Sequence, residues 1–100
     1  MTGANLSIEG GEWRLSGDLK IFLLSTELSH WMKQFPKEGP WKLLLEGVTR
    51  MDTGGLAFLL ACVKHAKSQQ LEVHFKSVPE SVWPLARAQG VAELLKAYVQ

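Results

Sequence analysis

The chain has 100 residues, of which 46% are hydrophobic, and we expect a single domain over residues 1–100 with one core. Eleven basic residues stand against ten acidic ones, and the resulting net charge of +1 argues against nucleic acid or an anionic membrane surface as the main partner. The single cysteine, Cys62, excludes an internal disulfide and favours a reducing compartment.

The sequence shows no pattern of secretion or membrane insertion. The N-terminal residues MTGANLSIEGGEW lack a basic stretch followed by an apolar one, which is the pattern of a signal peptide. The longest apolar run, Leu56–Val63, is far shorter than the roughly 20 residues that cross a bilayer. We therefore expect a cytosolic domain without direct membrane insertion, an expectation that is compatible with attachment to a membrane complex.

The first elements in chain order are a predicted hairpin and a predicted helix. Leu6–Glu9 alternates apolar and polar side chains, a Gly-Gly turn follows, and the alternation resumes in EWRLSGDL, so we expect two antiparallel strands. From Ile21 to Phe35 the apolar period becomes helical. Pro36 should end this helix, because proline lacks a backbone N–H and disfavours helical geometry in the residue before it. The residues that share the apolar face are Leu24, Leu28, Trp31, Met32 and Phe35.

After a loop over Pro36–Pro40, the second half of the chain alternates strands and helices. Trp41–Glu46 is mostly apolar, as a buried central strand requires, and a long helix should follow and close near Ser68. Leu71–Lys76 alternates again and predicts a further strand. Two short helices on either side of Gly90 end the chain, the first around Val82–Ala88. The order ββαβαβαα and the length of the crossovers predict an α/β fold with a mixed, mostly parallel sheet flanked by helices.

The stretch Glu46–Lys67 organises this arrangement, because it leads from the central strand through a short polar loop into the long helix. Asp52 and Thr53 suit a helix start, since their side-chain oxygens accept from unpaired backbone N–H groups. Gly54 and Gly55 cost helix stability, roughly 1 kcal/mol each relative to Ala, and leave the backbone bare. We interpret the four residues as a docking surface for a partner. The alternative is that Asp52 and Thr53 only cap the helix.

The faces of this helix lead to the same interpretation. Its expected core stripe is Leu56, Leu59, Leu60, Val63, Ala66 and the stem of Lys67. The opposite side carries Gly54, Phe58, Ala61, His65 and Ser68, and its first two turns hold no charge. Such a face is covered either by a partner or by the chain itself. We expect Phe58 to anchor a partner. The alternative is that Phe58 tucks under a neighbouring loop.

The sequence offers little for catalysis. His30, His65 and His74 lack the spacing of a zinc motif, and neither a phosphate-binding P-loop nor a G-x-S-x-G element is present. Cys62 and His65 form an i,i+3 pair, but a thiol in the middle of a helix is more often inert. We therefore expect no catalytic residue, no metal ligand and no cofactor.

Three features together resemble the STAS domain family, the fold of the anti-sigma factor antagonists. They are the order ββαβαβαα, the segment Leu15–Leu19 (LSGDL) and the segment Met51–Leu56 (MDTGGL), and the resemblance covers essentially the whole chain. Within the family, Arg50–Leu60 is most similar to the STAS subunits of phospholipid-transporting ABC complexes of Gram-negative bacteria. That similarity implies a non-catalytic subunit that sits peripherally on the inner membrane, in a complex with a permease and an MCE-type subunit.

In such a complex the subunit would bind the ABC transporter ATPase subunit and support its activity. The complex would maintain the lipid asymmetry of the outer membrane. The residues expected to contact the ATPase are Asp52, Thr53, Gly54, Gly55 and Phe58. The alternative function is that of an anti-sigma factor antagonist switched by phosphorylation of Thr53. In that branch a phosphorylated serine stands at the position of Thr53 and a second hydroxyl residue usually follows, whereas this chain has Gly54, and it has Lys20 where an acidic residue is common.

Overall fold

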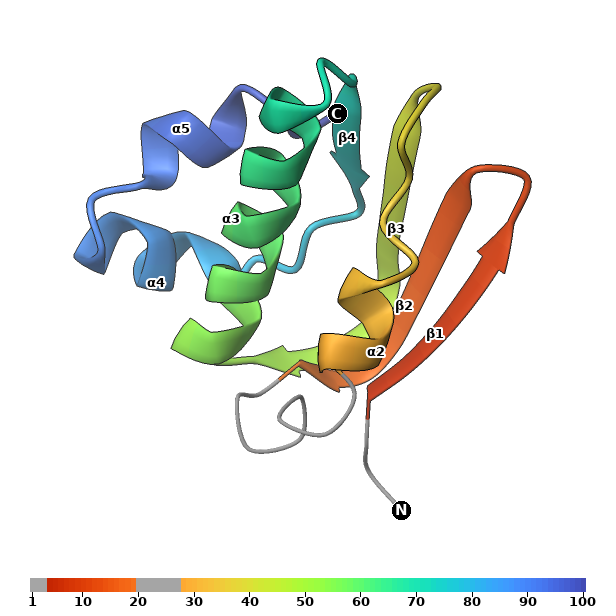
Figure 1. Cartoon of the computed structure of the whole chain (residues 1–100). Helices are drawn as coiled ribbons and strands as arrows, with labels where there is room; N and C mark the ends of the chain where they lie inside the picture. Colours follow the sequence, from red (N-terminus) through yellow and green to blue (C-terminus); the bar gives the residue numbers. More distant parts are fainter. Residues whose placement is uncertain (1–3, 20–27) are drawn as a thin grey trace.

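The computed structural model describes residues 4–19 and 28–100. The elements in these residues are β1 (Ala4–Glu9), β2 (Glu12–Leu19), α2 (Leu28–Met32), β3 (Trp41–Met51), α3 (Thr53–Ser68), β4 (Val73–Lys76), α4 (Val82–Ala88) and α5 (Ala92–Lys96). The described strands form one sheet in the order β1-β2-β3-β4 (Figure 1). The β1–β2 pair is antiparallel and the other pairs are parallel. The predicted order ββαβαβαα and the mixed, mostly parallel sheet are confirmed.

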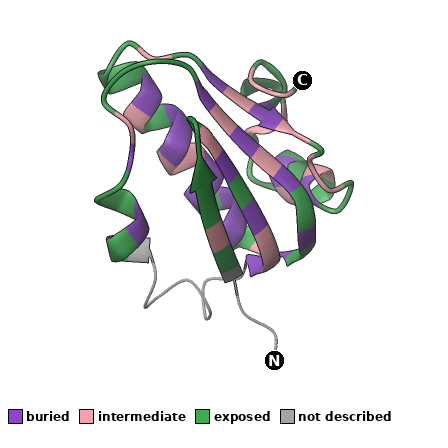
Figure 2. Ribbon diagram, turned by 90° about the vertical axis from the view of Figure 1, so that its right-hand side faces the viewer, coloured by how far each residue is buried: buried purple, intermediate pink, exposed green. Residues whose placement is uncertain are grey.

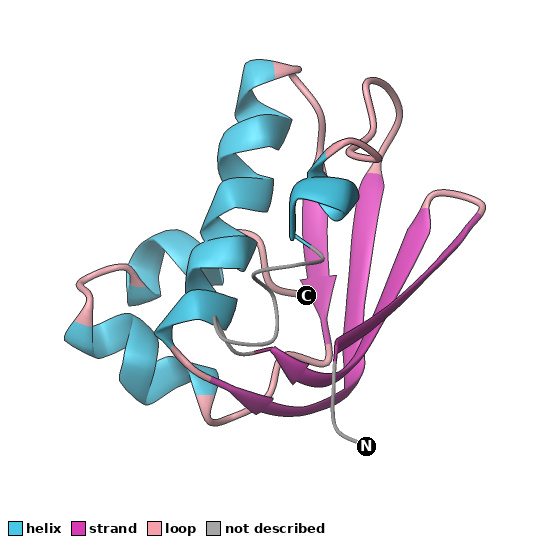
Figure 3. Ribbon diagram, turned by 60° about the horizontal axis from the view of Figure 1, so that its bottom comes forward, coloured by secondary structure: helices cyan, strands magenta, loops and turns pink. Residues whose placement is uncertain are grey.

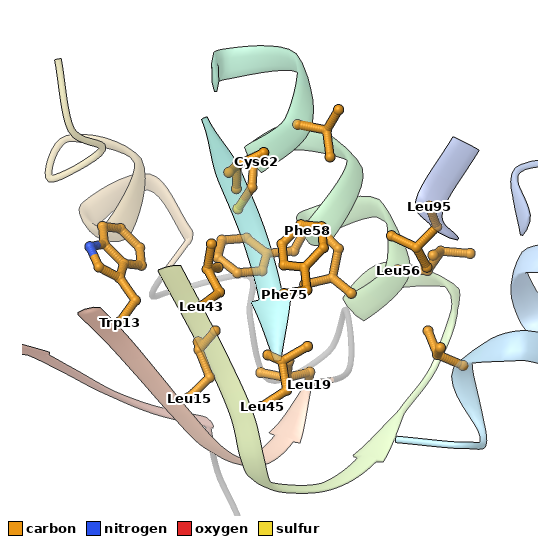
Figure 4. Close-up of a cluster of buried hydrophobic side chains, with 14 of the residues drawn as sticks. Trp13, Leu15, Leu19, Leu43, Leu45, Leu56, Phe58, Cys62, Phe75 and Leu95 are labelled. Atoms are coloured by element: carbon orange, nitrogen blue, oxygen red, sulfur yellow. The ribbon is translucent and has the colours of Figure 1, made fainter. Parts of the chain in front are cut away.

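The core lies between the sheet and the helices, which occupy one side of it (Figure 3). Along β2 and β3, buried side chains alternate with more exposed ones over most of each strand, because successive residues of a strand point to opposite faces (Figure 2). Trp13 and Leu15 on β2 and Leu43 and Leu45 on β3 are almost fully buried. α3 covers them with Leu56, Phe58, Leu59, Cys62, Val63 and Ala66 (Figure 4).

The central strand is longer than predicted. We expected Trp41–Glu46 and then a polar loop, but β3 continues to Met51. Val48 and Met51 are buried and pair in register with Gly17 and Leu19 of β2. The polar residues Thr49 and Arg50, which indicated a loop, are exposed residues of this strand, at a point where its register with β2 shifts.

The helix expected over Ile21–Phe35 is described in part. α2 covers Leu28–Met32, whereas residues 20–27, including Leu24 and Lys20, lie outside the described residues. The chain leaves the helix through a turn in which the N–H of Gln34 donates to the carbonyl of Trp31 at 2.9 Å. The predicted helix end at Phe35 is wrong, because α2 ends at Met32; Phe35 is buried beyond that end and directly precedes Pro36.

Candidate functional site

The start of α3 is built by Asp52, which is the N-cap. Its backbone is extended, with φ −113° and ψ −169°, and its Oδ1 accepts from the N–H groups of Gly54 at 2.8 Å and Gly55 at 3.1 Å. These are two of the backbone donors that a helix start leaves without intrahelical partners. The predicted capping role of Asp52 is therefore confirmed, and Thr53 stands beside it as the first residue of α3, exposed to solvent.

A second contact fixes the strand that leads into this cap. Thr49 Oγ1 donates to Asp18 Oδ1 at 2.8 Å, and Asp18 is only 7% exposed although it is ionisable. One step further, the N–H of Asp52 donates to the carbonyl of Leu19 at 3.3 Å. The LSGDL segment thus has a structural role that sequence reasoning missed, because its partner Thr49 is 31 residues away. It ties the end of β2 to the end of β3 directly before α3.

The chain itself buries the two glycines, so our interpretation of them as bare backbone for a partner is wrong. Gly54 and Gly55 are both buried. A Cβ placed on Gly55 would run into the carbonyl oxygen of Leu19 and would lie 2.6 Å from Cγ of Met51. Gly55 is therefore needed because α3 begins very close to the ends of β2 and β3.

Phe58 is also part of the core, and the prediction that it faces a partner is wrong. Its side chain is 1% exposed, and its ring lies 5.6 Å from that of Trp31 and 6.3 Å from that of Phe35, measured between centroids. The alternative, in which the chain itself covers Phe58, is correct. α2 and the residues that follow it pack on the uncharged side of α3 and bury the ring there. Figure 4 shows Phe58 within the cluster of buried hydrophobic side chains.

The surface that α3 leaves open is a different stripe, which we call the outer stripe. It consists of Thr53, Ala57, Leu60, Ala61 and Lys64, the first two and the last exposed and the other two half-buried. The i, i+4 and i+7 spacing from Thr53 puts these residues on one side of the helix. Sequence reasoning missed Ala57 and Lys64, although counting in steps of four from Thr53 would have reached Ala57 and Ala61. It also placed Leu60 and the stem of Lys67 in the core stripe, whereas Leu60 is only half-buried and Lys67 is exposed.

The side chains that could suggest catalysis are engaged elsewhere. Burial raises the pKa of the Cys62 thiol well above its usual value, which keeps the sulfur in its neutral, unreactive form. The Nε2 of His65 donates to the carbonyl of Pro36 at 2.7 Å rather than pairing with Cys62. In residues 4–19 and 28–100 there is no group of three His, Cys, Asp or Glu side chains that could hold a metal ion. None of the helices in that part of the chain has the length and hydropathy to span a bilayer.

The mixed sheet with its flanking helices is that of a STAS domain, and residues 7–96 match a STAS family model. The description of that model is the MlaB STAS domain, and the chain belongs to this family. A comparison with curated proteins gave no match.

The cap gives a first testable prediction. We expect Asp52→Ala to lower the free energy of unfolding by about 1 kcal/mol, because the N–H groups of Gly54 and Gly55 lose their acceptor. Urea unfolding followed by circular dichroism measures this change. Asp52→Asn keeps an acceptor oxygen and should stay within about 0.5 kcal/mol of the parent chain. Equal losses in the two variants would contradict the capping role.

Proposed function

We propose that this chain is a non-catalytic STAS subunit that binds the ATPase subunit of an ABC-type phospholipid transporter of the Mla kind and supports its activity. The match of residues 7–96 to the MlaB STAS domain carries this proposal. In the complex the ATPase also contacts a permease, which is joined to an MCE-type subunit. The chain then lies peripherally on the cytosolic side of the inner membrane, and the complex maintains the lipid asymmetry of the outer membrane.

The outer stripe of α3 is the surface that suits this contact. Thr53 and Ala57 are small, so a partner can approach the first two turns of the helix closely. Leu60, half-buried one turn later, offers the apolar area that we had assigned to Phe58. Phe58 supports the contact only indirectly, because its packing holds α2 against α3. Asp52, Gly54 and Gly55 likewise position Thr53 through the cap and the close approach to the sheet.

Substituting Thr53 tests the proposal. We expect Thr53→Glu to weaken binding of the purified ATPase at least tenfold and to remove the stimulation of ATP hydrolysis, because an unpaired carboxylate would be desolvated in the contact. The fold should persist, since a negative charge is favourable at a helix N-terminus. Binding is measured by isothermal titration calorimetry and turnover by phosphate release.

Thr53→Ser is the matched control, because it keeps the hydroxyl, and it should bind within about twofold of the parent chain. Unchanged affinity for Thr53→Glu, in a variant that unfolds at the same urea concentration as the parent chain, would contradict the assignment of the contact to Thr53.

One observation favours a second function, that of an anti-sigma factor antagonist switched at Thr53. Thr53 is exposed at the start of a helix, where a kinase can reach it and where phosphate is well tolerated. Against it, the next position holds the buried Gly54 rather than a second hydroxyl. Purification of the tagged chain from cells separates the two functions. Recovery of an ATPase with a Walker motif supports the transporter, and recovery of an anti-sigma kinase supports the switch.

A further inference from the structure

A groove runs between α2 and α3, beside the outer stripe. It is lined by Met32, Phe35, Ala61, Lys64, His65 and Ser68. Its floor is apolar, formed by the buried ring of Phe35 and the methyl group of Ala61, and Met32 stands at its rim with half of its surface exposed. Exposed methionines suit binding surfaces because their side chains adapt to irregular shapes. Figure 3 shows α2 and α3 on the same side of the sheet. We call it the α2–α3 groove.

The ionisable side chains that line the groove, Lys64 and His65, are both basic. The basic side chains of α3 are Lys64, His65 and Lys67, and the described residues of α2 contribute only His30; neither α3 nor Leu28–Met32 contains Asp or Glu. The loop after α2 carries the exposed charged residues Lys33, Lys37 and Glu38, and none of them lines the groove. Within the residues that the structure describes, Lys64 takes part in no ion pair. A nearly neutral chain therefore presents a locally cationic apolar groove.

We propose that the α2–α3 groove docks a segment of the partner ATPase that carries an apolar side chain flanked by Asp or Glu. The apolar side chain lies on Phe35 and Ala61, under Met32, and a neighbouring carboxylate pairs with the Lys64 ammonium group. This inference rests on the proposed function. The groove shares Ala61 and Lys64 with the outer stripe, so one partner that covers the stripe extends directly into it.

A protein segment fits the groove better than a lipid surface does. Recognition of anionic lipid usually needs a cluster of four to eight Lys or Arg side chains. The groove is lined by one lysine, and the Nε2 of His65 is already bound to the carbonyl of Pro36. A concave site with an apolar floor and one charge at its rim is typical of a pocket for a side chain.

Charge reversal at the rim is the first test, with purified ATPase as the probe. We expect Lys64→Glu to weaken ATPase binding at least tenfold and Lys64→Gln to weaken it less. Lys76→Glu makes the same change in net charge on β4, where Lys76 points away from the buried Val73 and Phe75, and it should bind within twofold of the parent chain. Raising the salt concentration should weaken ATPase binding by the parent chain more steeply than ATPase binding by the Lys64→Gln variant. Equal affinities for Lys64→Glu and Lys76→Glu would overturn the proposal.

Crosslinking identifies the occupant. A photo-crosslinking amino acid at position 61 should join the chain to an ATPase segment that contains Asp or Glu beside an apolar residue, and a crosslink to a segment without acidic residues would overturn the proposal. Vesicles with one third phosphatidylglycerol test the lipid alternative. Vesicle binding that Lys64→Glu abolishes, with ATPase affinity unchanged, would assign the groove to lipid instead.

The failure of this inference is distinguishable from failure of the proposed function. If Thr53→Glu weakens ATPase binding and Lys64→Glu does not, only the groove assignment is overturned. If the parent chain itself does not bind the ATPase, the proposed function fails, and the inference about the groove fails with it.

Discussion

Replacing Phe58 by alanine is expected to lower the free energy of unfolding by about 3–5 kcal/mol. The ring is 1% exposed and lies edge-on to Trp31, so its removal loses both buried apolar area and an aromatic pair. Domains of this size are stable by roughly 5–15 kcal/mol, and the variant should therefore be close to unfolding at 37 °C. Urea unfolding, followed by tryptophan fluorescence and far-ultraviolet circular dichroism, measures the loss.

Two other substitutions make the result for Phe58 specific. Phe58→Leu keeps most of the apolar volume and should cost clearly less than the alanine variant. Met32→Ala removes a large apolar side chain at the rim of the α2–α3 groove, where half of it is already exposed, and should cost less than about 1 kcal/mol. A loss below 1 kcal/mol for Phe58→Ala would show that α2 does not cover the ring in solution.

Gly55→Ala is expected to destabilise the domain by about 1–3 kcal/mol or more, against the usual preference of helices for alanine. The added methyl group would run into the backbone carbonyl of Leu19 and the side chain of Met51, and the carbonyl belongs to a strand that cannot move away alone. The sign of the change is therefore diagnostic. On an unobstructed helix the same substitution stabilises by up to about 1 kcal/mol.

Chemical denaturation of Gly55→Ala shows whether the substitution lowers or raises the free energy of unfolding. A gain in stability would mean that α3 does not begin as close to β2 as the structure shows. Because the first turn of α3 must shift away from the sheet to accept the methyl group, we also expect the variant to bind the ATPase more weakly than its remaining folded fraction accounts for.

Local chemistry was sufficient to predict the order of the elements and the cap. Alternation and helical periodicity separate strands from helices, and the residue type of Asp52 marks a helix start, because these properties depend on neighbours in the sequence. The extension of β3 to Met51 was missed because Thr49 and Arg50 are polar, and their strand conformation depends on pairing with β2. That pairing joins residues about thirty positions apart, so it produces no periodic pattern in the local sequence.

The errors at the site have the same origin. The sequence shows that Gly54 and Phe58 lie on an uncharged side of α3 and that Gly55 adjoins it, but it does not show what covers these residues. The cover for Phe58 comes from Trp31 and Phe35, and Gly55 lies against Leu19. Helical periodicity alone assigns one face of a helix to the core and the opposite face to solvent or a partner. α3 has its sheet on one side and α2 on another, so the face left to solvent is narrower than the periodicity indicates.

The cap has a consequence for any modification of Thr53. The N–H groups of Gly54 and Gly55 are already bound by the carboxylate of Asp52, so they are not available to hold a phosphate on the neighbouring residue. A phosphate there would meet an adjacent negative charge and would extend outward from the exposed end of α3. The phosphate would therefore act by electrostatic repulsion of an approaching partner, while the domain itself kept its fold.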